Sequence, residues 1–261
     1  MSEAPAEWAA ARLTARRDDE LALSVVVPVR NEGPNIEALV AEIARALEPM
    51  GAFEIVYVDD GSDDDTAREL ARARTAEPRL RVVRHARPGG QSAALRSGVL
   101  SARAPLIATL DGDGQNDPAE LPRLLETFEA AADDVPLGLV GGDRSASRRD
   151  RWIKRQTSRI ANAVRGRVLG DRSLDTGCGL KVMRRDAYLL LPYFDHQHRF
   201  LPALFLREGF AVRAVPVGHR PRTRGRSKYG TLDRLAVGVV DLWGVGWLMR
   251  RRRPVRAIED G

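Results

Sequence analysis

Two aspartates near the middle of the chain, Asp111 and Asp113, have the residue type and spacing of a metal site. They follow a short apolar run at residues 106–110, and glycines lie between and after them. A buried strand would therefore deliver two carboxylates to an exposed, sharply turning loop. Mg²⁺ and Mn²⁺ take oxygen ligands and are usually held by one or two carboxylates together with the phosphates of a substrate. An isolated Asp-x-Asp is more often a turn whose aspartates bond their own backbone, so the context must decide.

Strands and helices that alternate along the first half of the chain must position these carboxylates. Apolar and often β-branched runs lie at 23–29, 53–58, 80–84 and 106–110. Segments with the 3.6-residue period of a helix begin at Pro34, near Asp65 and near Gln91. The alternation predicts an α/β fold with a right-handed, mostly parallel central sheet flanked by helices. Ligands of such sheets bind beyond the carboxyl ends of the strands.

Polar or glycine-rich residues follow each of the predicted strands, and together they would line one crevice. They are Asn31 and Glu32, residues 59–62, residues 89–91 and residues 111–113. Each group alone is more typical of a helix cap or a turn. A nucleotide in the crevice would have its base or ribose bonded by Asp59 and its diphosphate bridged through a metal to Asp111 and Asp113. No Gly-x-Gly-x-x-Gly follows the first strand and no P-loop motif occurs, which weighs against dinucleotide oxidoreductases and P-loop enzymes.

The composition fits a globular chain with an anionic partner. The 261 residues are 43% hydrophobic, and 42 Lys and Arg against 36 Asp and Glu give a formal charge of +6. Cys178 is the single cysteine, which excludes an internal disulfide and a thiolate zinc cluster and fits a reducing compartment. Residues 1–20 lack the apolar core of a signal peptide, and no uncharged apolar run has the roughly 18–20 residues of a membrane span.

Basic residues concentrate in two segments of the second half. Residues 144–172 contain ten Lys and Arg but only two acidic residues, which favours contact with an anion over a solvated helix face. A second basic segment, 219–229, would equally grip RNA if it were taken alone. The chain has only 5% aromatic residues, and no aromatic platform for stacking is interleaved with these basic side chains. Nucleic acid is therefore not the expected partner.

A helix predicted over residues 231–250 combines an apolar pattern with tryptophans and ends in four arginines. Asp233, Arg234 and Asp241 interrupt the pattern, so it is not expected to span a bilayer. Trp243 and Trp247 next to the arginines suit the surface of an anionic membrane, where each basic residue adds about 1 kcal/mol. The alternative is an ordinary C-terminal helix packed on the domain.

Three segments in order along the chain resemble the motifs of a family 2 glycosyltransferase with the GT-A fold. They are residues 25–32, residues 58–66 and residues 111–118. Within that family the chain is most similar, over about residues 21–232, to the dolichol-phosphate mannose synthase-like branch of polyprenyl-phosphate glycosyltransferases. The resemblance implies a single Rossmann-like GT-A domain over 21–230. A disordered or loosely helical tail over 1–20 would precede it, and an amphipathic membrane-interface helix with a basic tail would follow over 231–261.

The resemblance implies transfer of a sugar, with inversion, from a GDP- or UDP-linked donor to a dolichyl- or undecaprenyl-type polyprenyl phosphate. The product would be a lipid-linked monosaccharide donor for envelope glycan or lipid modification. Mg²⁺ or Mn²⁺ would be bound by Asp111 and Asp113, with help from Gln115. Asp111, Asp113, Arg222 and Lys228 are the expected catalytic residues. The nucleotide sugar is expected to contact Pro28, Arg30, Asn31, Glu32, Asp59, Asp60, Gln91, Gly112 and Asp175.

The resemblance also implies which residues bind the acceptor phosphate: five basic residues and one serine that match positions of the same branch. They are Arg144, Lys154, Arg155, Ser158, Arg222 and Lys228. Arg222 and Lys228 have the Arg-x-x-x-x-Ser-Lys spacing of the branch's acceptor loop, which Gly225 and Gly230 would hinge. Lys154 stands where the branch has arginine, so Arg155 is expected to share its role.

The segment 174–181 resembles the family's Asp-Thr-x-x-Gly-Phe-Arg loop beside the sugar, with departures that leave the donor sugar open. Gly177, Cys178 and Lys181 differ from that pattern. Cys178 is not expected to be a nucleophile, because no imidazole is placed to activate it. The histidines show no metal-ligand spacing, and surface or capping roles are expected for His85, His196, His198 and His219.

Many relatives carry membrane helices after this point, and this chain shows none. We therefore expect a cytoplasmic protein, peripheral on the inner face of the cytoplasmic membrane or docked to a small membrane-anchoring protein. One alternative is a glycosyltransferase that acts on a hydroxyl acceptor in polysaccharide or glycolipid synthesis. That enzyme would need a carboxylate base and would not need Arg222 and Lys228. The other is a non-catalytic, membrane-associated scaffold of the same fold.

Overall fold

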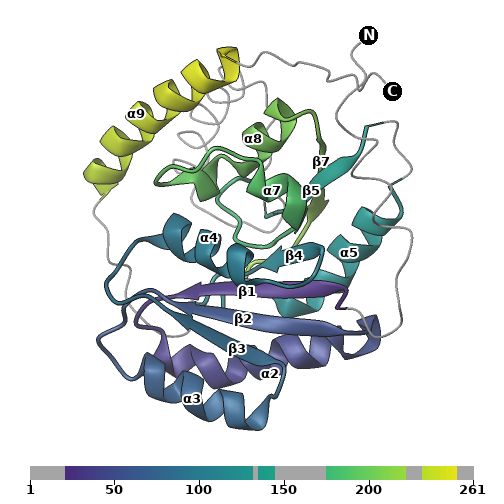
Figure 1. Cartoon of the computed structure of the whole chain (residues 1–261), viewed down its shortest axis with the longest axis vertical. Coiled ribbons are helices and arrows are strands. Elements are labelled where there is room, and N and C mark those ends of the chain that lie inside the picture. The colour runs from purple at the N-terminus through teal and green to yellow at the C-terminus, as the bar shows by residue number, and fades with distance from the viewer. Residues whose placement is uncertain (1–20, 132–134, 145–174, 222–230, 252–261) are drawn as a thin grey trace, which may run out of the picture.

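The computed structural model describes residues 21–131, 135–144, 175–221 and 231–251 of the chain. In these residues seven strands form one sheet in the order β3-β2-β1-β4-β6-β5-β7 (Figure 1). The strands are β1 (Leu23–Val29), β2 (Phe53–Asp59), β3 (Leu80–Arg84), β4 (Leu106–Thr109), β5 (Leu137–Asp143), β6 (Lys181–Arg184) and β7 (Ala211–Pro216).

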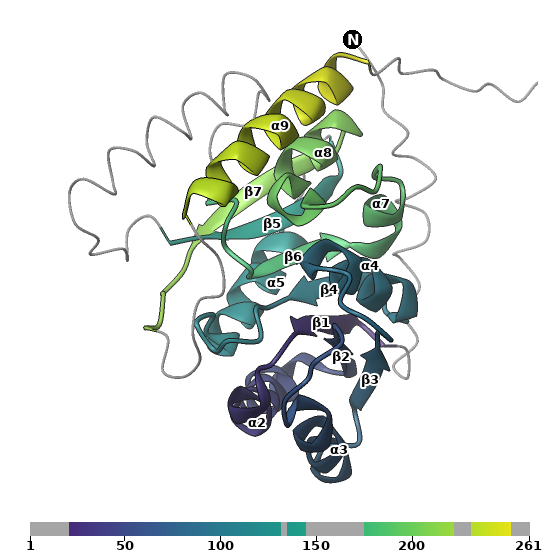
Figure 2. The same ribbon diagram turned by 90° about the vertical axis from the view of Figure 1, so that its left-hand side faces the viewer.

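Helices cover both faces of this sheet (Figures 1 and 2). They are α2 (Ile36–Leu47), α3 (Thr66–Ala76), α4 (Gln91–Ser101), α5 (Leu121–Glu129), α7 (Arg185–Leu189), α8 (Leu201–Arg207) and α9 (Thr231–Arg250). Short 3₁₀ turns are η1 (Gly33–Asn35), η2 (Glu48–Met50), η3 (Pro118–Glu120) and η4 (Gln197–Arg199). The expected α/β fold and its mostly parallel sheet are confirmed.

The buried valines of β1 explain why the sheet has two cores. Side chains alternate between the faces of a strand, so Val25 and Val27 pack with α2, α3 and α5, whereas Val26 packs with α4, α7 and α8. All three are completely buried. A strand that is buried on both faces has a continuous apolar sequence. This is why the sequence of residues 23–29 predicted a parallel strand.

One strand of the sheet, β6, was not placed from the sequence. It has four residues, begins and ends with a basic residue, and is nevertheless wholly buried. It runs antiparallel to β4 and to β5, and its first residue, Lys181, pairs with Thr109 at the carboxyl end of β4. The segment before β6 is thereby brought back to the edge of the sheet that carries Asp111.

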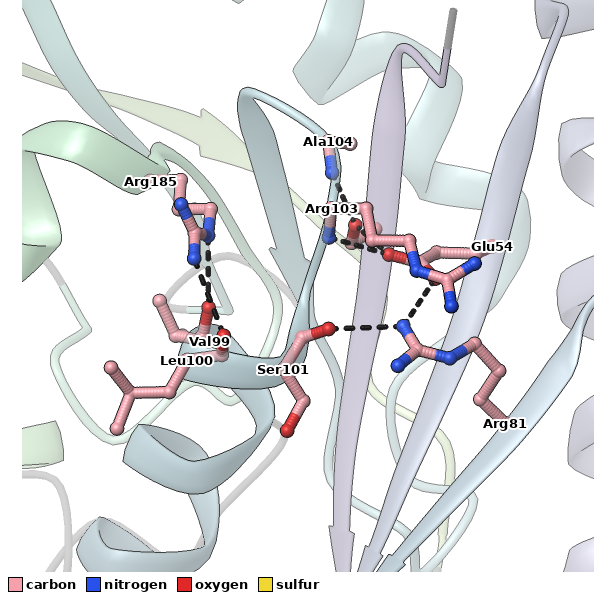
Figure 3. A network of polar contacts seen from close by, with 9 residues as sticks. Glu54, Arg81, Val99, Leu100, Ser101, Arg103, Ala104 and Arg185 are labelled. Carbon is pink, nitrogen blue, oxygen red and sulfur yellow. Dashed lines mark hydrogen bonds and ion pairs between the residues drawn. The ribbon is translucent and has the colours of Figure 1, made fainter.

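A polar network around Glu54 of β2 fastens the end of α4 to the sheet (Figure 3). The buried Glu54 carboxylate accepts hydrogen bonds of 2.7 Å from Arg81 Nη1, from the Arg103 backbone N–H and from Ser24 Oγ. Arg81 also donates to the Ser101 carbonyl oxygen at 2.9 Å. The network fixes α4, whose other end reaches the crevice.

The helix α9 has the bounds expected from the sequence and lies on the outside of the molecule next to α8 (Figure 2). Its Val245 is buried in the core, and Arg207 Nε of α8 donates to the Leu248 carbonyl oxygen at 3.2 Å. The opposite side of α9 exposes Trp243 (76%) and Trp247 (51%). Among the residues that the structure describes, no helix combines the length and apolar character needed to cross a bilayer.

Candidate active site

A cleft of about 640 Å³ lies beyond the carboxyl ends of β1 and β4, where the sequence predicted a crevice. One wall comes from residues 28–32 and Asp60, and residues 109–113 follow from β4. Gly90 and Gln91 enter from the start of α4. The remaining wall comes from the second half of the chain, as Thr176, Gly177, Cys178, Gly179, Lys181, His198, Arg199 and Leu201.

The carboxylates of Asp111 and Asp113 lie in the middle of this cleft, held by local hydrogen bonds. Gln91 Nε2 donates to Asp111 Oδ1 at 3.0 Å, and the Gln115 backbone N–H donates to Asp113 Oδ1 at 3.1 Å. Burial raises the pKa of Asp111, the Asp113 charge raises it further, and the charges of Lys181 and Arg144 oppose the rise. Two like charges held this close are stabilised by a cation.

This donor set fits a hard divalent cation. Within the described parts of the chain, no group of three or more His, Cys, Asp and Glu side chains is placed to hold a metal. The remaining coordination positions would therefore fall to water and to the phosphates of a substrate, as is usual for Mg²⁺. The Gln115 side-chain nitrogen lies 3.4 Å from His219 Nε2 and 3.5 Å from the Arg220 carbonyl oxygen, and its role as a ligand remains a prediction.

Two glycines allow the backbone to approach the carboxylate pair. A Cβ added at Gly112 would lie 2.3 Å from Val29 Cγ1, and one added at Gly179 would lie 2.3 Å from Asp111 Oδ2. Thr109 Oγ1 donates to the Gly179 carbonyl oxygen at 2.6 Å, which fixes this close approach. The loop before β6 therefore packs directly against the candidate metal site.

The expected nucleotide-binding loops lie together on one side of the cleft. The Asn31 backbone N–H donates to Ser62 Oγ at 3.0 Å, which ties the loop after β1 to the loop after β2. Asp60 accepts hydrogen bonds from the backbone N–H groups of Gly89 and Gly90 at 2.7 and 2.8 Å, and it contacts His85 Nδ1. Burial raises the pKa of Asp60, but these hydrogen bonds and the His85 charge outweigh it and leave the pKa below its ordinary value.

Asp59, which was expected to bond the base or ribose, is only 1% exposed and does not line the cleft. Its Oδ1 accepts from the Ser62 backbone N–H at 2.9 Å, and its Oδ2 lies 3.5 Å from Arg84 Nε. The contact of Asp59 with a nucleotide remains a prediction. Of the other expected donor contacts, the structure brings Pro28, Arg30, Asn31, Glu32, Asp60, Gln91 and Gly112 to the cleft.

Arg144 and Asp175, which were assigned to different substrates, are paired with each other. Arg144 Nε and Nη2 donate to the two carboxylate oxygens of Asp175 at 2.6 and 3.1 Å. Neither residue is among those that line the cleft, although Thr176 and Gly177 beside Asp175 are. Burial lowers the pKa of Arg144, but the Asp175 carboxylate outweighs it and raises the pKa overall.

Sequence reasoning did not assign a site role to three cleft residues: Lys181, His198 and Arg199. Lys181 is 5% exposed and donates from Nζ to the Cys178 carbonyl oxygen. His198, for which a surface or capping role was expected, lines the cleft and lies 2.7 Å from Ser92 Oγ through Nδ1. Lys181 ends the segment that resembles the family's loop beside the sugar, whereas no motif in the sequence marks His198 or Arg199, because only the fold brings η4 to the cleft.

Five expected acceptor-binding residues lie outside the described residues and remain predictions. They are Lys154, Arg155, Ser158, Arg222 and Lys228. The expected tail over residues 1–20 also lies outside the described residues.

Comparisons with known proteins agree with the motifs. The family model described as Glycosyl transferase family 2 matches residues 24–190. Dodecaprenyl-phosphate galacturonate synthase of Rhizobium johnstonii is 35% identical over 242 residues, which are 90% of this chain and 69% of that protein. Undecaprenyl-phosphate 4-deoxy-4-formamido-L-arabinose transferase of Edwardsiella ictaluri is 36% identical over 215 residues, 80% of this chain and 63% of that protein. The chain thus spans about two thirds of the length of these curated relatives.

Solved structures share the architecture at lower identity. A glucosyl-3-phosphoglycerate synthase from Mycobacterium tuberculosis, in complex with Mn²⁺ and UDP-glucose, has a TM-score of 0.66 at 22% identity and covers 87% of this chain and 79% of its own. A mannosyltransferase from Pyrobaculum calidifontis, in complex with GDP-Man and Mn²⁺, has a TM-score of 0.66 at 18% identity, with coverage of 94% and 71%. At these identities the likeness concerns the fold alone.

Proposed function

The chain belongs to glycosyl transferase family 2, and from this premise we propose that it transfers a sugar from a nucleotide sugar to the phosphate of a polyprenyl phosphate. One observation carries the proposal: Asp111 and Asp113 share a cleft with residues 28–32, beyond the carboxyl ends of β1 and β4. The relatives named for dodecaprenyl and undecaprenyl phosphate align with 80–90% of the chain, which supports the same class of acceptor.

The donor side of the cleft would bind the nucleotide sugar. Residues 28–32 and Asp60 would contact the nucleoside, while Asp111 and Asp113 would hold Mg²⁺ or Mn²⁺ against the diphosphate. When bound, the metal would act as a Lewis acid that neutralises the departing nucleoside diphosphate. Gln91, whose amide donates to Asp111, would keep that carboxylate oriented.

The acceptor phosphate would attack without a protein base. A phosphate monoester is ionised near pH 7, so one of its oxygens can form the new bond to the anomeric carbon directly. The bond from that carbon to the donor's phosphate oxygen breaks, and its electron pair leaves with the nucleoside diphosphate. We assign the acceptor side to Arg222 and Lys228 of the basic loop, with Lys154, Arg155 and Ser158.

Position on a membrane completes the proposal. Exposed Trp243 and Trp247 lie on α9, which ends at Arg250, and the guanidinium of the next residue, Arg251, lies 5.2 Å from the centre of the Trp247 ring. Aromatic rings beside cations suit the interface of an anionic bilayer. We propose that 231–261 rests on the inner face of the cytoplasmic membrane, alone or with a small anchoring protein, and that 21–230 is the catalytic domain.

The test is a screen of UDP- and GDP-linked sugars with undecaprenyl phosphate and Mg²⁺ or Mn²⁺, read by the mass of the lipid product. A lipid-linked monosaccharide that forms only with metal is the expected result. Transfer to hydroxyl acceptors alone would replace the proposal with the polysaccharide or glycolipid alternative. Absence of both transfer and donor hydrolysis with every sugar would favour the scaffold.

A further inference from the structure

One end of the cleft carries three nitrogen donors from the second half of the chain: Lys181, His198 and Arg199. In the sheet order, β1 and β2 lie on one side of β4 and β6 lies on the other. The loops after β1 and β2 form the donor wall, so Lys181 at the start of β6 lies across the Asp111 carboxylate from that wall.

Neither cation of this group forms a salt bridge within the described residues, although burial lowers the pKa of Lys181 and the Asp111 charge opposes that fall. Lys181 Nζ donates to the Cys178 carbonyl oxygen, and within the described residues it makes no other hydrogen bond and no salt bridge. An ammonium has three N–H donors, so two are left for a ligand. The Arg199 guanidinium, in η4, likewise has no carboxylate partner among the residues that the structure describes. A half-buried cation without a carboxylate partner, as Arg199 is within the described residues, calls for an anion.

His198 adds a neutral ring between them. Ser92 Oγ accepts from the His198 backbone N–H at 3.2 Å and lies 2.7 Å from His198 Nδ1. Nε2 is therefore the ring nitrogen that is left for a ligand. Burial, followed by the charges of Arg199 and Lys181, lowers the pKa of His198 to about 3, which keeps the ring neutral and shows that both cations lie within electrostatic range of it.

The same end of the cleft is connected to the helix that we assign to the membrane surface. His196 Nδ1, in the turn before Arg199, lies 3.0 Å from Asp241 Oδ2 of α9. Trp243 follows two residues later on α9 and is 76% exposed. A ligand that arrives from the lipid side of α9 would therefore meet η4 before it meets the donor wall.

We propose that Lys181, Arg199 and Nε2 of His198 form the site that binds the phosphate of the lipid acceptor. The proposal rests on the proposed function and deepens it by assigning acceptor contacts within the described residues. Inversion requires the attacking oxygen and the leaving diphosphate to lie on opposite sides of the anomeric carbon. A phosphate on the β6 side, facing a diphosphate on the β1 side, meets that requirement.

The experiment compares Arg199→Gln, Lys181→Met and the charge-retaining Arg199→Lys with a matched control, Arg72→Gln. Arg72 is on α3 and forms only a surface pair with Glu69. Farnesyl phosphate serves as a short acceptor, and the donor is the nucleotide sugar that gives the highest turnover in the screen. Arg199→Gln is expected to raise the KM for farnesyl phosphate about 10- to 100-fold, the range for a charge-assisted hydrogen bond. The KM for the donor and metal-dependent donor hydrolysis without acceptor should stay at the level of Arg72→Gln, and Arg199→Lys should recover part of the loss.

Calorimetry of farnesyl phosphate, with farnesol as the uncharged control, tests the site without turnover. The site is supported if farnesyl phosphate binds the wild type and if Arg199→Gln and Lys181→Met both weaken this binding. If Lys181→Met does not fold, Arg199→Gln alone still tests the site. A raised donor KM with an unchanged acceptor KM would assign the cations to the donor and overturn the inference. A wild-type protein that binds farnesyl phosphate, while the screen gives no transfer to undecaprenyl phosphate with any sugar, would refute the proposed function while leaving the phosphate site standing.

Discussion

Arg144 and Asp175 face each other in a bidentate ion pair, with nitrogen to oxygen distances of 2.6 and 3.1 Å. Arg144 directly follows β5, and Asp175 lies in the segment that leads into β6. The pair therefore fixes the loop that packs against Asp111, and each partner satisfies a charge that the other would leave buried.

Removing one partner of this pair should be more costly than removing both. Asp175→Leu removes the carboxylate that both Arg144 Nε and Arg144 Nη2 contact in a buried position, so the free energy of unfolding should fall by about 3–5 kcal/mol. The double variant Arg144→Met with Asp175→Leu should lie closer to the wild type than either Arg144→Met or Asp175→Leu alone. Urea unfolding of the four proteins measures the coupling, and additive losses would contradict the pairing.

Asp113→Ala should abolish metal-dependent transfer without unfolding the protein. The loss of one of the two carboxylates of the candidate metal site weakens metal binding, and the expected decrease in kcat/KM is about 100-fold or more. Removing the Asp113 charge also removes its electrostatic repulsion of the Asp111 carboxylate, so the melting temperature measured without metal should not fall. Glu37→Ala, at an exposed position of α2, is the control. Full activity of Asp113→Ala would argue against the metal site.

The sequence predicted the parts of the site that follow buried parallel strands. Residues 28–32 and 111–113 lie directly after apolar runs, so their place at one sheet edge follows from the chain order alone. The bounds of β1 and α9 also agree with the periodicity, and the family resemblance is confirmed by the family model over residues 24–190.

The other wall of the cleft could not be predicted in the same way. Strand β6 is too short for a periodic pattern and has a basic residue at each end, so its burial depends on tertiary partners such as Asp186, which pairs with Arg184. Without β6 in place, only the resemblance of residues 174–181 to the loop beside the sugar indicates that Lys181 lies near Asp111. His198 reaches the cleft through a hydrogen bond with Ser92, 106 positions earlier in the chain.

Gly179→Ala should damage catalysis more than it damages the fold. An added Cβ would lie 2.3 Å from Asp111 Oδ2, so the carboxylate or the loop must move, and a displacement of about 1 Å near reacting groups costs about 100-fold in rate. Gly244→Ala is the matched control, because an added Cβ there meets nothing within 4 Å. Steady-state kinetics at several Mn²⁺ concentrations would test this. Equal activity of the two variants would show that close packing of the Gly179 backbone against Asp111 is not required.

Acid should destabilise the wild type through Glu54. Burial raises the pKa of Glu54, but hydrogen bonds from Ser24, Arg81 and the Arg103 backbone outweigh it and place the folded pKa below the unfolded one. The stabilisation is then fully present above the unfolded glutamate pKa of about 4.3 and is lost as the pH falls through the folded value. Glu54→Gln should be less stable at pH 7 and should lose less stability between about pH 5 and pH 3. Chemical unfolding across this range measures both slopes, and parallel curves would contradict the assignment.

The exposed tryptophans of α9 should govern binding to lipid. Trp243→Ala and Trp247→Ala remove rings that are 76% and 51% exposed, so the fold should not change. Each variant should lose about 1 kcal/mol of the free energy of burying a ring in the membrane interface. Its partition into vesicles containing anionic phospholipid should therefore weaken about fivefold. Leu100→Ala, at another large apolar side chain that is 53% exposed but lies on α4, is the control. Binding should also weaken as salt rises, because Arg250 and Arg251 follow the tryptophans. If both tryptophan variants sediment with anionic vesicles as the wild type does, α9 is not the surface that meets the membrane.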